Sequence, residues 1–196
     1  YLSSSSKTLL LQSQVLAKNT ISKFNLNSKS FITEIASNDG YLLQYFKKKK
    51  INCLGVEPTK IPFLASKKKG ILSMNNFFDF KLSKDIIKKY GKSDVVIANN
   101  VIAHIPNLNN FTKGLINLLK QNGVLIVEFQ YLNSMIKKKL FDNIYHEHYY
   151  YYSLNSFQKI IDKFSCKIIN YDELPAHGGS LRVYITHKKN ILKVSK

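Results

Sequence analysis

The chain has 196 residues, 44% of them hydrophobic and 21% charged, which suits one globular domain with a sizeable core. The formal net charge of +18 comes almost entirely from lysine, and the two cysteines, Cys53 and Cys166, exclude a disulfide framework and a cysteine metal set. No apolar run approaches the ~20 residues of a membrane span. Because the cysteines are so few, we expect a protein of the reducing cytoplasm. Because the chain begins with Tyr1 and not with methionine, we also expect a piece of a longer protein.

The lysines occur in runs such as 47–50, 67–69 and 137–139. These runs fall at expected helix ends, where lysine suits the helix dipole and solvation. A basic surface also attracts anions, including nucleic acid and phosphorylated small molecules. No arginine-rich stripe or nucleic-acid motif accompanies the lysines, so we do not expect nucleic acid as a partner.

The first predicted elements are a lead-in helix over 3–24 and a strand, turn and helix over 31–46. The turn reads ASNDG, and its small residues would let a ligand approach the free backbone N–H groups at the start of the helix. Glu34, near the strand end, could accept a hydrogen bond from a bound amine. The dinucleotide-binding pattern G-x-G-x-x-G is absent. A tight turn with no ligand remains the alternative at this point.

Strands alternate with helices through the middle of the chain. We predict strands over 52–58, 71–74, 93–100 and 123–130, and helices over 62–70, 83–90 and 108–119. This order indicates an α/β fold with a parallel sheet, helices on both faces and ligands at the carboxyl ends of the strands. Glu57 lies about twenty residues beyond the turn, where an acid accepts hydrogen bonds from ribose hydroxyls in nucleotide-binding folds.

Histidine and tyrosine gather beyond the fifth strand, in the segment IYHEHYYYYS over 144–153. If this segment is extended, His146 and His148 share one face, and Tyr145, Glu147 and Tyr149 share the other. We interpret it as catalytic, because histidine titrates near neutrality and a neighbouring carboxylate raises its basicity. A zinc site lacks the helical H-E-x-x-H spacing, and an aromatic surface cluster is the remaining alternative.

The last predicted elements are a helix over 154–164 and an antiparallel pair over 166–174 and 181–187. Arg182, the only arginine, follows His177 and the glycines at 178 and 179. A guanidinium binds carboxylate or phosphate through two N–H groups, which lysine cannot do. We therefore expect Arg182 to contact the substrate and not a structural carboxylate, with an ordinary surface arginine as the alternative.

Six segments resemble the sugar C-methyltransferases, which act on nucleotide-linked keto-deoxysugars. In chain order they read EIASNDGYLL, GVEP, ANNVIAHIPNL, GVLIVEFQYL, FDNIYHEHYYYYSL and HGGSLRVYI. The turn is similar to motif I of class I S-adenosylmethionine methyltransferases, acidic-x-G-x-G-x-G, with Ala36 and Asn38 in place of two glycines and Gly40 retained. The resemblance implies a Rossmann-like class I methyltransferase sheet, mostly parallel with a closing antiparallel strand and with helices on both faces.

The resemblance also implies a mechanism and a set of site residues. His148 matches the base that removes a proton next to a ketone, so that the resulting enolate attacks the methyl group, and Tyr145 and Glu147 match the polar groups beside it. S-adenosylmethionine is the implied cofactor, and no metal is expected. Its implied contacts are Ala36, Ser37, Asn38, Gly40 and Glu57, with Asn76 and Phe77 at the adenine and Asn99 and Asn100 at the methionine part. His177 and Arg182 are the implied substrate contacts.

The implied organisation is a lead-in helix over 1–30, a cofactor-binding core over 31–130, and a catalytic loop with closing strands over 131–196 of the same domain. Family members carry a zinc-binding domain before and a further domain after this region, and both are expected as flanking parts of the same polypeptide. Two other functions stay open. They are a small-molecule O- or N-methyltransferase and a basic nucleic-acid-binding module without catalysis.

Overall fold

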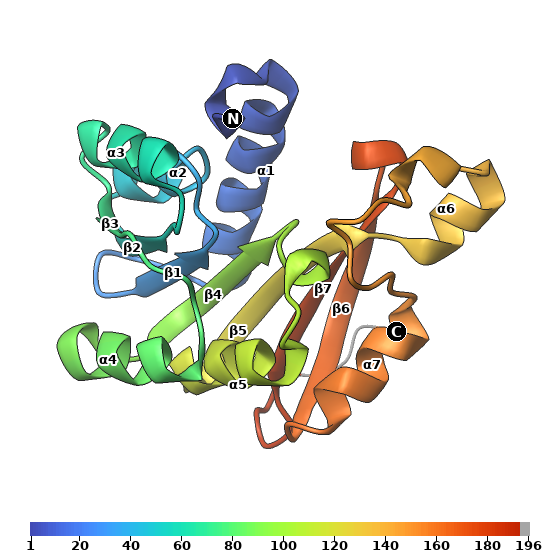
Figure 1. The fold of residues 1–196 in the computed structure, drawn as a ribbon. Helices are drawn as coiled ribbons and strands as arrows, with labels where there is room; N and C mark the ends of the chain where they lie inside the picture. The colour runs from blue at the N-terminus through green and yellow to red at the C-terminus, as the bar shows by residue number, and fades with distance from the viewer. Residues whose placement is uncertain (193–196) are drawn as a thin grey trace.

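The computed structural model describes residues 1–192, apart from the side chain of His177, and these residues form a seven-stranded sheet with helices on both faces (Figure 1). The strands are β1 (Phe31–Ile35), β2 (Asn52–Val56), β3 (Leu72–Met74), β4 (Ser93–Asn99), β5 (Leu119–Gln130), β6 (Cys166–Leu174) and β7 (Ser180–His187). Their order is β3-β2-β1-β4-β5-β7-β6, with β7 antiparallel to both neighbours and the other pairs parallel. The predicted mostly parallel sheet with a closing antiparallel strand is confirmed.

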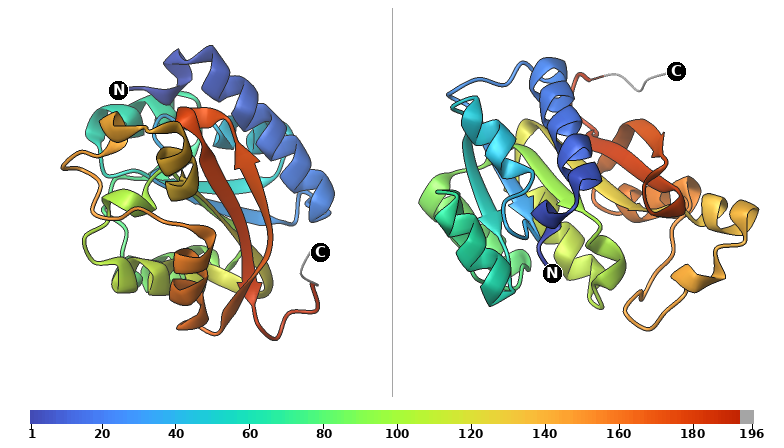
Figure 2. Two further views of the ribbon diagram at one scale, coloured as in Figure 1. Left: turned by 90° about the vertical axis from the view of Figure 1, so that its right-hand side faces the viewer. Right: turned by 90° about the horizontal axis from the view of Figure 1, so that it is seen from above.

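Successive residues of the central strands face two separate cores, as the pleat of a strand requires. On one face, residues such as Val96 and Leu125 pack against α4 (Phe80–Tyr90), α5 (Leu108–Leu118) and α7 (Leu154–Asp162). On the other, residues such as Ile97 and Ile126 pack against α1 (Lys7–Lys23) and α2 (Leu43–Lys48). Figure 2 shows α1 along its face of the sheet.

Capping residues move several helix boundaries from the predicted places. A short 3-10 helix, η1 (Ser3–Ser5), precedes α1, whose N-cap Ser6 accepts a hydrogen bond from the Leu9 N–H group. The helix α4 begins before the predicted residue 83 because the Asp79 side chain caps it. The turn after β1 is longer than expected, so that α2 begins only at Leu43.

The remaining helices lie around the ends of the strands. α3 (Lys60–Lys68) connects β2 to β3, and α6 (Leu132–Lys138), which the sequence did not predict as a separate helix, follows β5. Three more 3-10 turns are η2 (Ile102–His104), η3 (Phe141–Asn143) and η4 (Ala176–Gly178). Within the described residues, every helix is too short or too polar to cross a lipid bilayer.

The strand order reverses between β1 and β4, whose neighbours β2 and β5 lead away in opposite directions. At such a reversal the connections leave to opposite sides, which opens a crevice at the carboxyl ends of the strands. Ile35 and Asn99 end the two strands at this crevice. The topology therefore places the turn at 36–40 beside the segment that follows β4.

Candidate functional site

The turn after β1 holds three residues in the left-handed backbone conformation. Ala36, Asn38 and Gly40 have φ angles of 57°, 48° and 74°. Glycine adopts this conformation without strain, asparagine tolerates it, and alanine pays a steric cost. Ala36 and Asn38, which stand where motif I has glycines, thus both adopt a backbone conformation that glycine adopts freely.

Glu57 fixes this turn from the end of β2. Its Oε2 accepts a hydrogen bond of 2.9 Å from the Asn38 N–H group, and its Oε1 accepts one of 2.8 Å from the Thr59 N–H group. The residue is only 4% exposed. The carboxylate is therefore held in one orientation with lone pairs left for a ligand.

A cavity of about 420 Å³ opens over the turn and the end of β4. Six of the predicted site residues line it, namely Ala36, Asn38, Glu57, Asn99, Asn100 and Tyr145. Tyr41, His104 and the N-terminal residues Tyr1, Ser3 and Leu9 complete the wall. The cavity is large enough for a small-molecule ligand or cofactor.

Four predicted cofactor contacts do not line the cavity, and two of these belong to the turn itself. Ser37 and Gly40 are buried and joined by a hydrogen bond of 3.0 Å from the Gly40 N–H group to the Ser37 carbonyl. Asn76 and Phe77 follow β3 on the surface, where Phe77 is 86% exposed, and neither lines the cavity. Their assignment to the adenine stays a prediction with no cavity contact to support it.

The N-terminal segment lies against the same turn. The Ser3 N–H group donates to Asn38 Oδ1 at 2.9 Å, and the Asn38 amide donates to the Tyr1 carbonyl at 3.4 Å. The Ser4 hydroxyl donates to the Asp39 carboxylate. The segment at 1–4 therefore forms one wall of the cavity.

Acidic side chains are buried around this cavity in an otherwise basic chain. Glu34, Asp39 and Glu57 are each at most 4% exposed. Burial, followed by the charges of Glu57 and Asp39, raises the pKa of Glu34 well above its ordinary value. Burial thus favours the neutral form of Glu34 when no cation lies nearby.

Several buried polar atoms at this edge, including Glu34 Oε2 and Asn99 Oδ1, have no hydrogen-bond partner among the described residues. Buried polar atoms are normally paired. Burial, followed by the charges of Glu34 and Glu128, raises the pKa of the nearby Tyr41. A hydrogen bond from the Asn99 side chain lowers this pKa, but by less. The unpaired acceptors suit a ligand that carries amine and hydroxyl donors.

A second cavity of about 160 Å³ adjoins the first. Asn100, His104 and Tyr145 line both cavities, whereas His148 lines only the second. Ala103, Phe129, Gln130 and Asn143 form the rest of its wall. Two ligands placed in these cavities would meet at the three shared residues.

The segment at 145–148 is a turn and not an extended strand. The His148 N–H group donates to the Tyr145 carbonyl at 3.1 Å, and the Tyr145 hydroxyl lies 3.2 Å from His148 Nε2. The predicted alternation, with Tyr145 and His148 on opposite faces, is therefore wrong, because the turn closes them onto one side. His146 and Glu147 occupy the tip of the turn, and both are exposed.

The segment that follows β4 anchors this turn. The Tyr149 N–H group donates to the Ala103 carbonyl at 2.8 Å, and His104 Nδ1 lies 3.1 Å from the Glu147 carbonyl. The rings of His104 and His148 are in edge-to-face contact, with centroids 4.7 Å apart. His104 was not among the site residues predicted from the sequence. Its place after the fourth strand, at the edge where ligands bind, was the signal for it.

Burial, followed by the charge of His104, lowers the pKa of His148, and the Asn143 backbone and the Glu147 carboxylate only partly oppose this. The Glu147 carboxylate does raise the pKa of the ring, as expected, but burial and His104 outweigh it. The lowered pKa keeps His148 neutral at neutral pH, which is the form that accepts a proton.

Arg182 lies on β7 opposite Glu128 on β5. Its Nε and Nη2 groups donate to Glu128 Oε2 at 3.0 and 2.6 Å, and both residues are buried. The expectation that Arg182 has no structural carboxylate partner is therefore wrong, because the antiparallel register places Glu128 directly across from it. The side chain of His177, the other predicted substrate contact, lies outside the described residues.

Metal-ligating side chains do not converge in the described part of the chain. Residues 1–192, without the His177 side chain, contain no group of three or more His, Cys, Asp or Glu residues placed to hold a metal ion.

Comparisons with known proteins converge on one kind of domain. A family model described as "Methyltransferase domain" matches residues 13–171. The C-methyltransferase NovU of Streptomyces niveus is 25% identical over 184 residues, which are 94% of this chain and 44% of NovU. The chain thus spans less than half the length of that curated relative.

Solved structures share the fold at low sequence identity. Magnesium protoporphyrin IX methyltransferase from Synechocystis with bound SAH has a TM-score of 0.70 and 14% identity over 91% of this chain and 83% of that one. A SAM-dependent methyltransferase from Anabaena variabilis has a TM-score of 0.68 and 13% identity, and the match covers 90% and 85% of the two chains. At this level of identity the likeness concerns the fold.

Proposed function

Because the chain belongs to the methyltransferase domain family, we propose that it is the central domain of a C-methyltransferase that acts on a nucleotide-linked keto-deoxysugar. It is a class I methyltransferase, and its cofactor is S-adenosylmethionine. The match to the C-methyltransferase NovU supports carbon as the methyl acceptor. The Y-H-E-H and H-G-G-S-L-R segments support the sugar nucleotide, with flanking domains of the same polypeptide as further contributors.

The residues at the first cavity fit the cofactor. Glu57 is oriented by two backbone N–H groups to accept hydrogen bonds from ribose hydroxyls. The unpaired Asn99 Oδ1 on the cavity wall suits an ammonium group, and the buried carboxyl groups of Glu34 and Asp39 nearby suit a ligand with a sulfonium charge. When bound, S-adenosylmethionine supplies an electrophilic methyl group. In this proposal residues 31–130 bind the cofactor, and residues 131–196 complete the acceptor site.

In this proposal His148 is the base that removes a proton from the acceptor carbon. A carbon next to a ketone is not nucleophilic until it loses a proton. Neutral His148 takes that proton on its unprotonated ring nitrogen, and the electron pair of the broken C–H bond stays on the substrate as the enolate. The Tyr145 hydroxyl, 3.2 Å from Nε2, positions the ring. The single observation that carries the proposal is that Tyr145, Asn100 and His104 line both cavities while His148 lines only the acceptor side.

A solvent-exchange experiment on the full-length enzyme tests the role of His148. With S-adenosylhomocysteine present no methyl group can transfer, and the native enzyme should wash deuterium from D₂O into the keto-sugar. Since positioned proton transfer contributes about 10²–10⁴-fold, His148→Asn should slow this exchange by that factor while cofactor affinity stays unchanged.

His146→Asn is the matched control, because His146 lies two residues away, is exposed and lines neither cavity. It should exchange at the native rate. Equal exchange by the native and His148→Asn enzymes would show that His148 is not the base. Methylation of a hydroxyl or amine acceptor that tolerates His148→Asn would favour an O- or N-methyltransferase.

A further inference from the structure

The edge of the sheet opposite the cofactor cavity carries a basic groove. Two hollows of about 750 and 560 Å³ lie at the amino ends of the strands, and they share Lys29 and Lys120. We call this pair of hollows the basal groove. The lysines that line it are Lys23, Lys29, Lys47, Lys89, Lys92 and Lys120.

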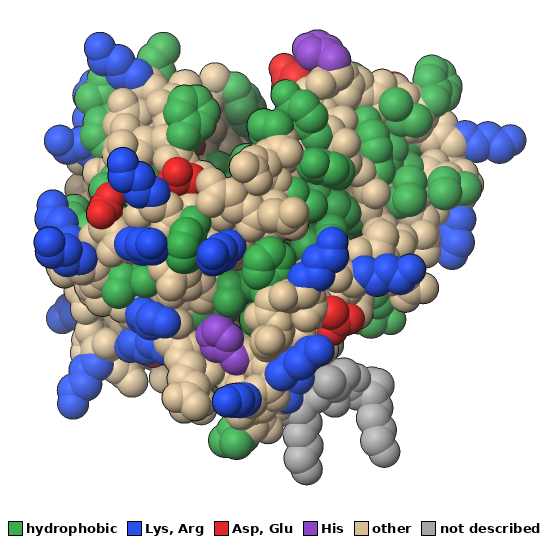
Figure 3. Space-filling view, turned by 60° about the horizontal axis from the view of Figure 1, so that its bottom comes forward, with side chains coloured by type: hydrophobic (Ala, Val, Ile, Leu, Met, Phe, Trp, Pro, Cys, Tyr) green, Lys and Arg blue, Asp and Glu red, His purple; other side chains and the backbone are tan. Residues whose placement is uncertain are grey.

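Acidic residues do not balance these lysines. Within the described residues, Asp94 is the one acidic residue that lines the basal groove. Its carboxylate forms an ion pair of 2.8 Å with Lys120 and accepts a hydrogen bond of 2.8 Å from the Phe31 N–H group. Figure 3 shows lysine side chains across the lower face, with few acidic side chains between them. The groove therefore has a positive potential, which attracts anions.

Some of these lysines serve the fold, and others do not. The Lys47 Nζ donates to the Lys69 and Gly70 carbonyls at 3.1 and 2.7 Å. Lys29 and Lys92, in contrast, are exposed, and their ammonium groups have no hydrogen bond or ion pair with the described residues. Lys29 lies in the loop before β1, outside any helix, so the helix-dipole explanation does not account for it. These two charges are available to a ligand.

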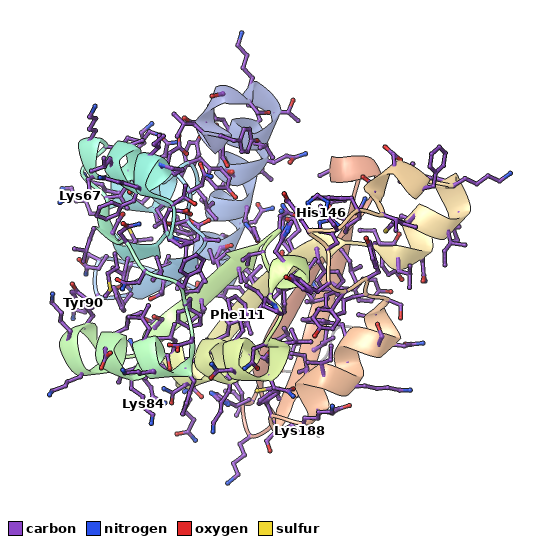
Figure 4. The ribbon with its side chains drawn as sticks, viewed as in Figure 1. Lys67, Lys84, Tyr90, Phe111, His146 and Lys188 are labelled. Atoms are coloured by element: carbon purple, nitrogen blue, oxygen red, sulfur yellow. The ribbon has the colours of Figure 1, made fainter. Side chains whose placement is uncertain are left out.

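Aromatic and aliphatic side chains also line the larger hollow. The rings of Phe31 and Tyr90 lie with centroids 6.4 Å apart, and Leu72, on the edge strand β3, is 48% exposed. The Lys89 Nζ lies over the Tyr90 ring, 5.1 Å from the ring centroid. Figure 4 shows Tyr90 at the end of α4, on the other side of the molecule from His146. A groove lined by both aromatic rings and lysines suits single-stranded nucleic acid, because bases stack on the rings and phosphates pair with the cations.

We propose that the basal groove binds single-stranded nucleic acid, with a base against Tyr90 and phosphates against Lys29 and Lys92. Sequence patterns missed this groove because its lysines come from separate loops and helix ends, with no motif among them. The groove shares no lining residue with the cofactor and acceptor cavities. The proposal is thus independent of the proposed catalytic function.

Fluorescence anisotropy with a labelled oligouridylate RNA, titrated with the 196-residue chain over a range of salt concentrations, tests the proposal. Each lost phosphate contact should reduce the salt slope by about 0.7, so Lys29→Gln with Lys92→Gln should reduce it by about 1.4 and weaken binding about tenfold at low salt. The control pair Lys137→Gln and Lys159→Gln removes the same charge from exposed positions on α6 and α7. It should change the affinity by less than about twofold.

A second pair of variants tests stacking. Tyr90→Leu should weaken RNA binding at least about fivefold, because base–aromatic stacking contributes about 1–3 kcal/mol per base. Tyr90→Phe keeps the ring and should bind like the native chain, and thermal unfolding of both variants checks that they fold. Affinity for S-adenosylhomocysteine should be the same throughout.

Three outcomes would overturn the proposal. If the native chain does not bind the RNA at low salt, there is no such site. If the control lysine pair weakens binding as much as the groove pair, net charge and not the groove is responsible. If the lysine pair matters but Tyr90→Leu binds normally and heparin competes equally well, the groove is a general polyanion site without recognition of bases.

Discussion

Ala36 holds a backbone conformation that its own methyl group disfavours. Its φ of 57° lies in the left-handed region, between a buried strand and the residues that line the cofactor cavity. Alanine in the left-handed conformation costs about 1–2 kcal/mol of steric strain. Glycine avoids this strain, but it loses more conformational entropy on folding, which offsets part of the gain. The backbone conformation of this turn therefore lowers the stability of the folded protein.

Ala36→Gly should raise the free energy of unfolding by about 0.5–1 kcal/mol, since glycine adopts this φ without strain. Urea denaturation measures the change. The matched control is Ala65→Gly in the middle of α3, where glycine should lower the free energy of unfolding by about 1 kcal/mol. A loss of stability in both variants would show that the turn does not strain Ala36.

Glu34 predicts a dependence of stability on pH. Its pKa is raised in the folded protein, so the unfolded chain loses the proton first as the pH rises past about 4.3. From there up to its folded pKa, the folded state is penalised by up to about 1.4 kcal/mol per pH unit. Glu34→Gln has no proton to lose, and its stability relative to the native chain should therefore increase as the pH rises. Urea titrations from acid to neutral pH measure this, and a constant difference would contradict the raised pKa.

At the scale of elements, the antiparallel pair β5–β7 contains the buried ion pair of Glu128 and Arg182. Removing one partner leaves the other as an unpaired buried charge, which typically costs about 3–5 kcal/mol. Replacing both with apolar residues removes the desolvation cost together with the attraction. The free-energy cost of losing one side chain of the pair therefore depends on whether the other is present.

Arg182→Leu and Glu128→Leu should each lower the free energy of unfolding by about 3–5 kcal/mol, and the double variant should lose much less than their sum. Chemical denaturation of the native chain, the two single variants and the double variant gives the interaction free energy of the pair. Additive losses would mean that the two side chains do not interact, and they would return Arg182 to the substrate role that its solitary place in the sequence suggested.

Elements were more predictable from the sequence than the contacts between them. Apolar periodicity located the strands and most helices, because each pattern reflects one side of one element. The turn at 145–148 could not be predicted, because its closure depends on hydrogen bonds to Ala103 and to the ring of His104, about forty residues earlier. The partner of Arg182 could not be predicted either, because the contact with Glu128 depends on the register between β5 and β7.

At the scale of the whole molecule, charge is divided between the two edges of the sheet. Glu34, Asp39, Glu57 and Glu128 are buried near the carboxyl ends of the strands, whereas the lysines of the basal groove lie at the amino ends. Composition gave the net charge of +18 but could not give this division, because it arises only when the sheet brings distant segments together.

The net charge predicts that salt stabilises the molecule. Like charges on the surface repel one another in the folded state, and the screening length falls from about 30 Å at 0.01 M salt to about 10 Å at 0.1 M. The melting temperature should therefore rise by several degrees between these concentrations, equally in sodium and potassium chloride. Calorimetry measures it, and a melting temperature that stays constant or falls would show that the surface lysines are too far apart to repel.

The position of β7 has a consequence for how the chain reaches its native state. This strand lies between β5 and β6, although both precede it in the chain. Until residues 180–187 have been synthesised, the outer edge of β5, which carries the apolar sequence VLIVEF, has no partner, and β6 has nothing to join. Unpaired apolar edges favour aggregation, and distant pairing is slow. A ribosome-bound or truncated chain that ends before β7 is therefore expected to need a chaperone.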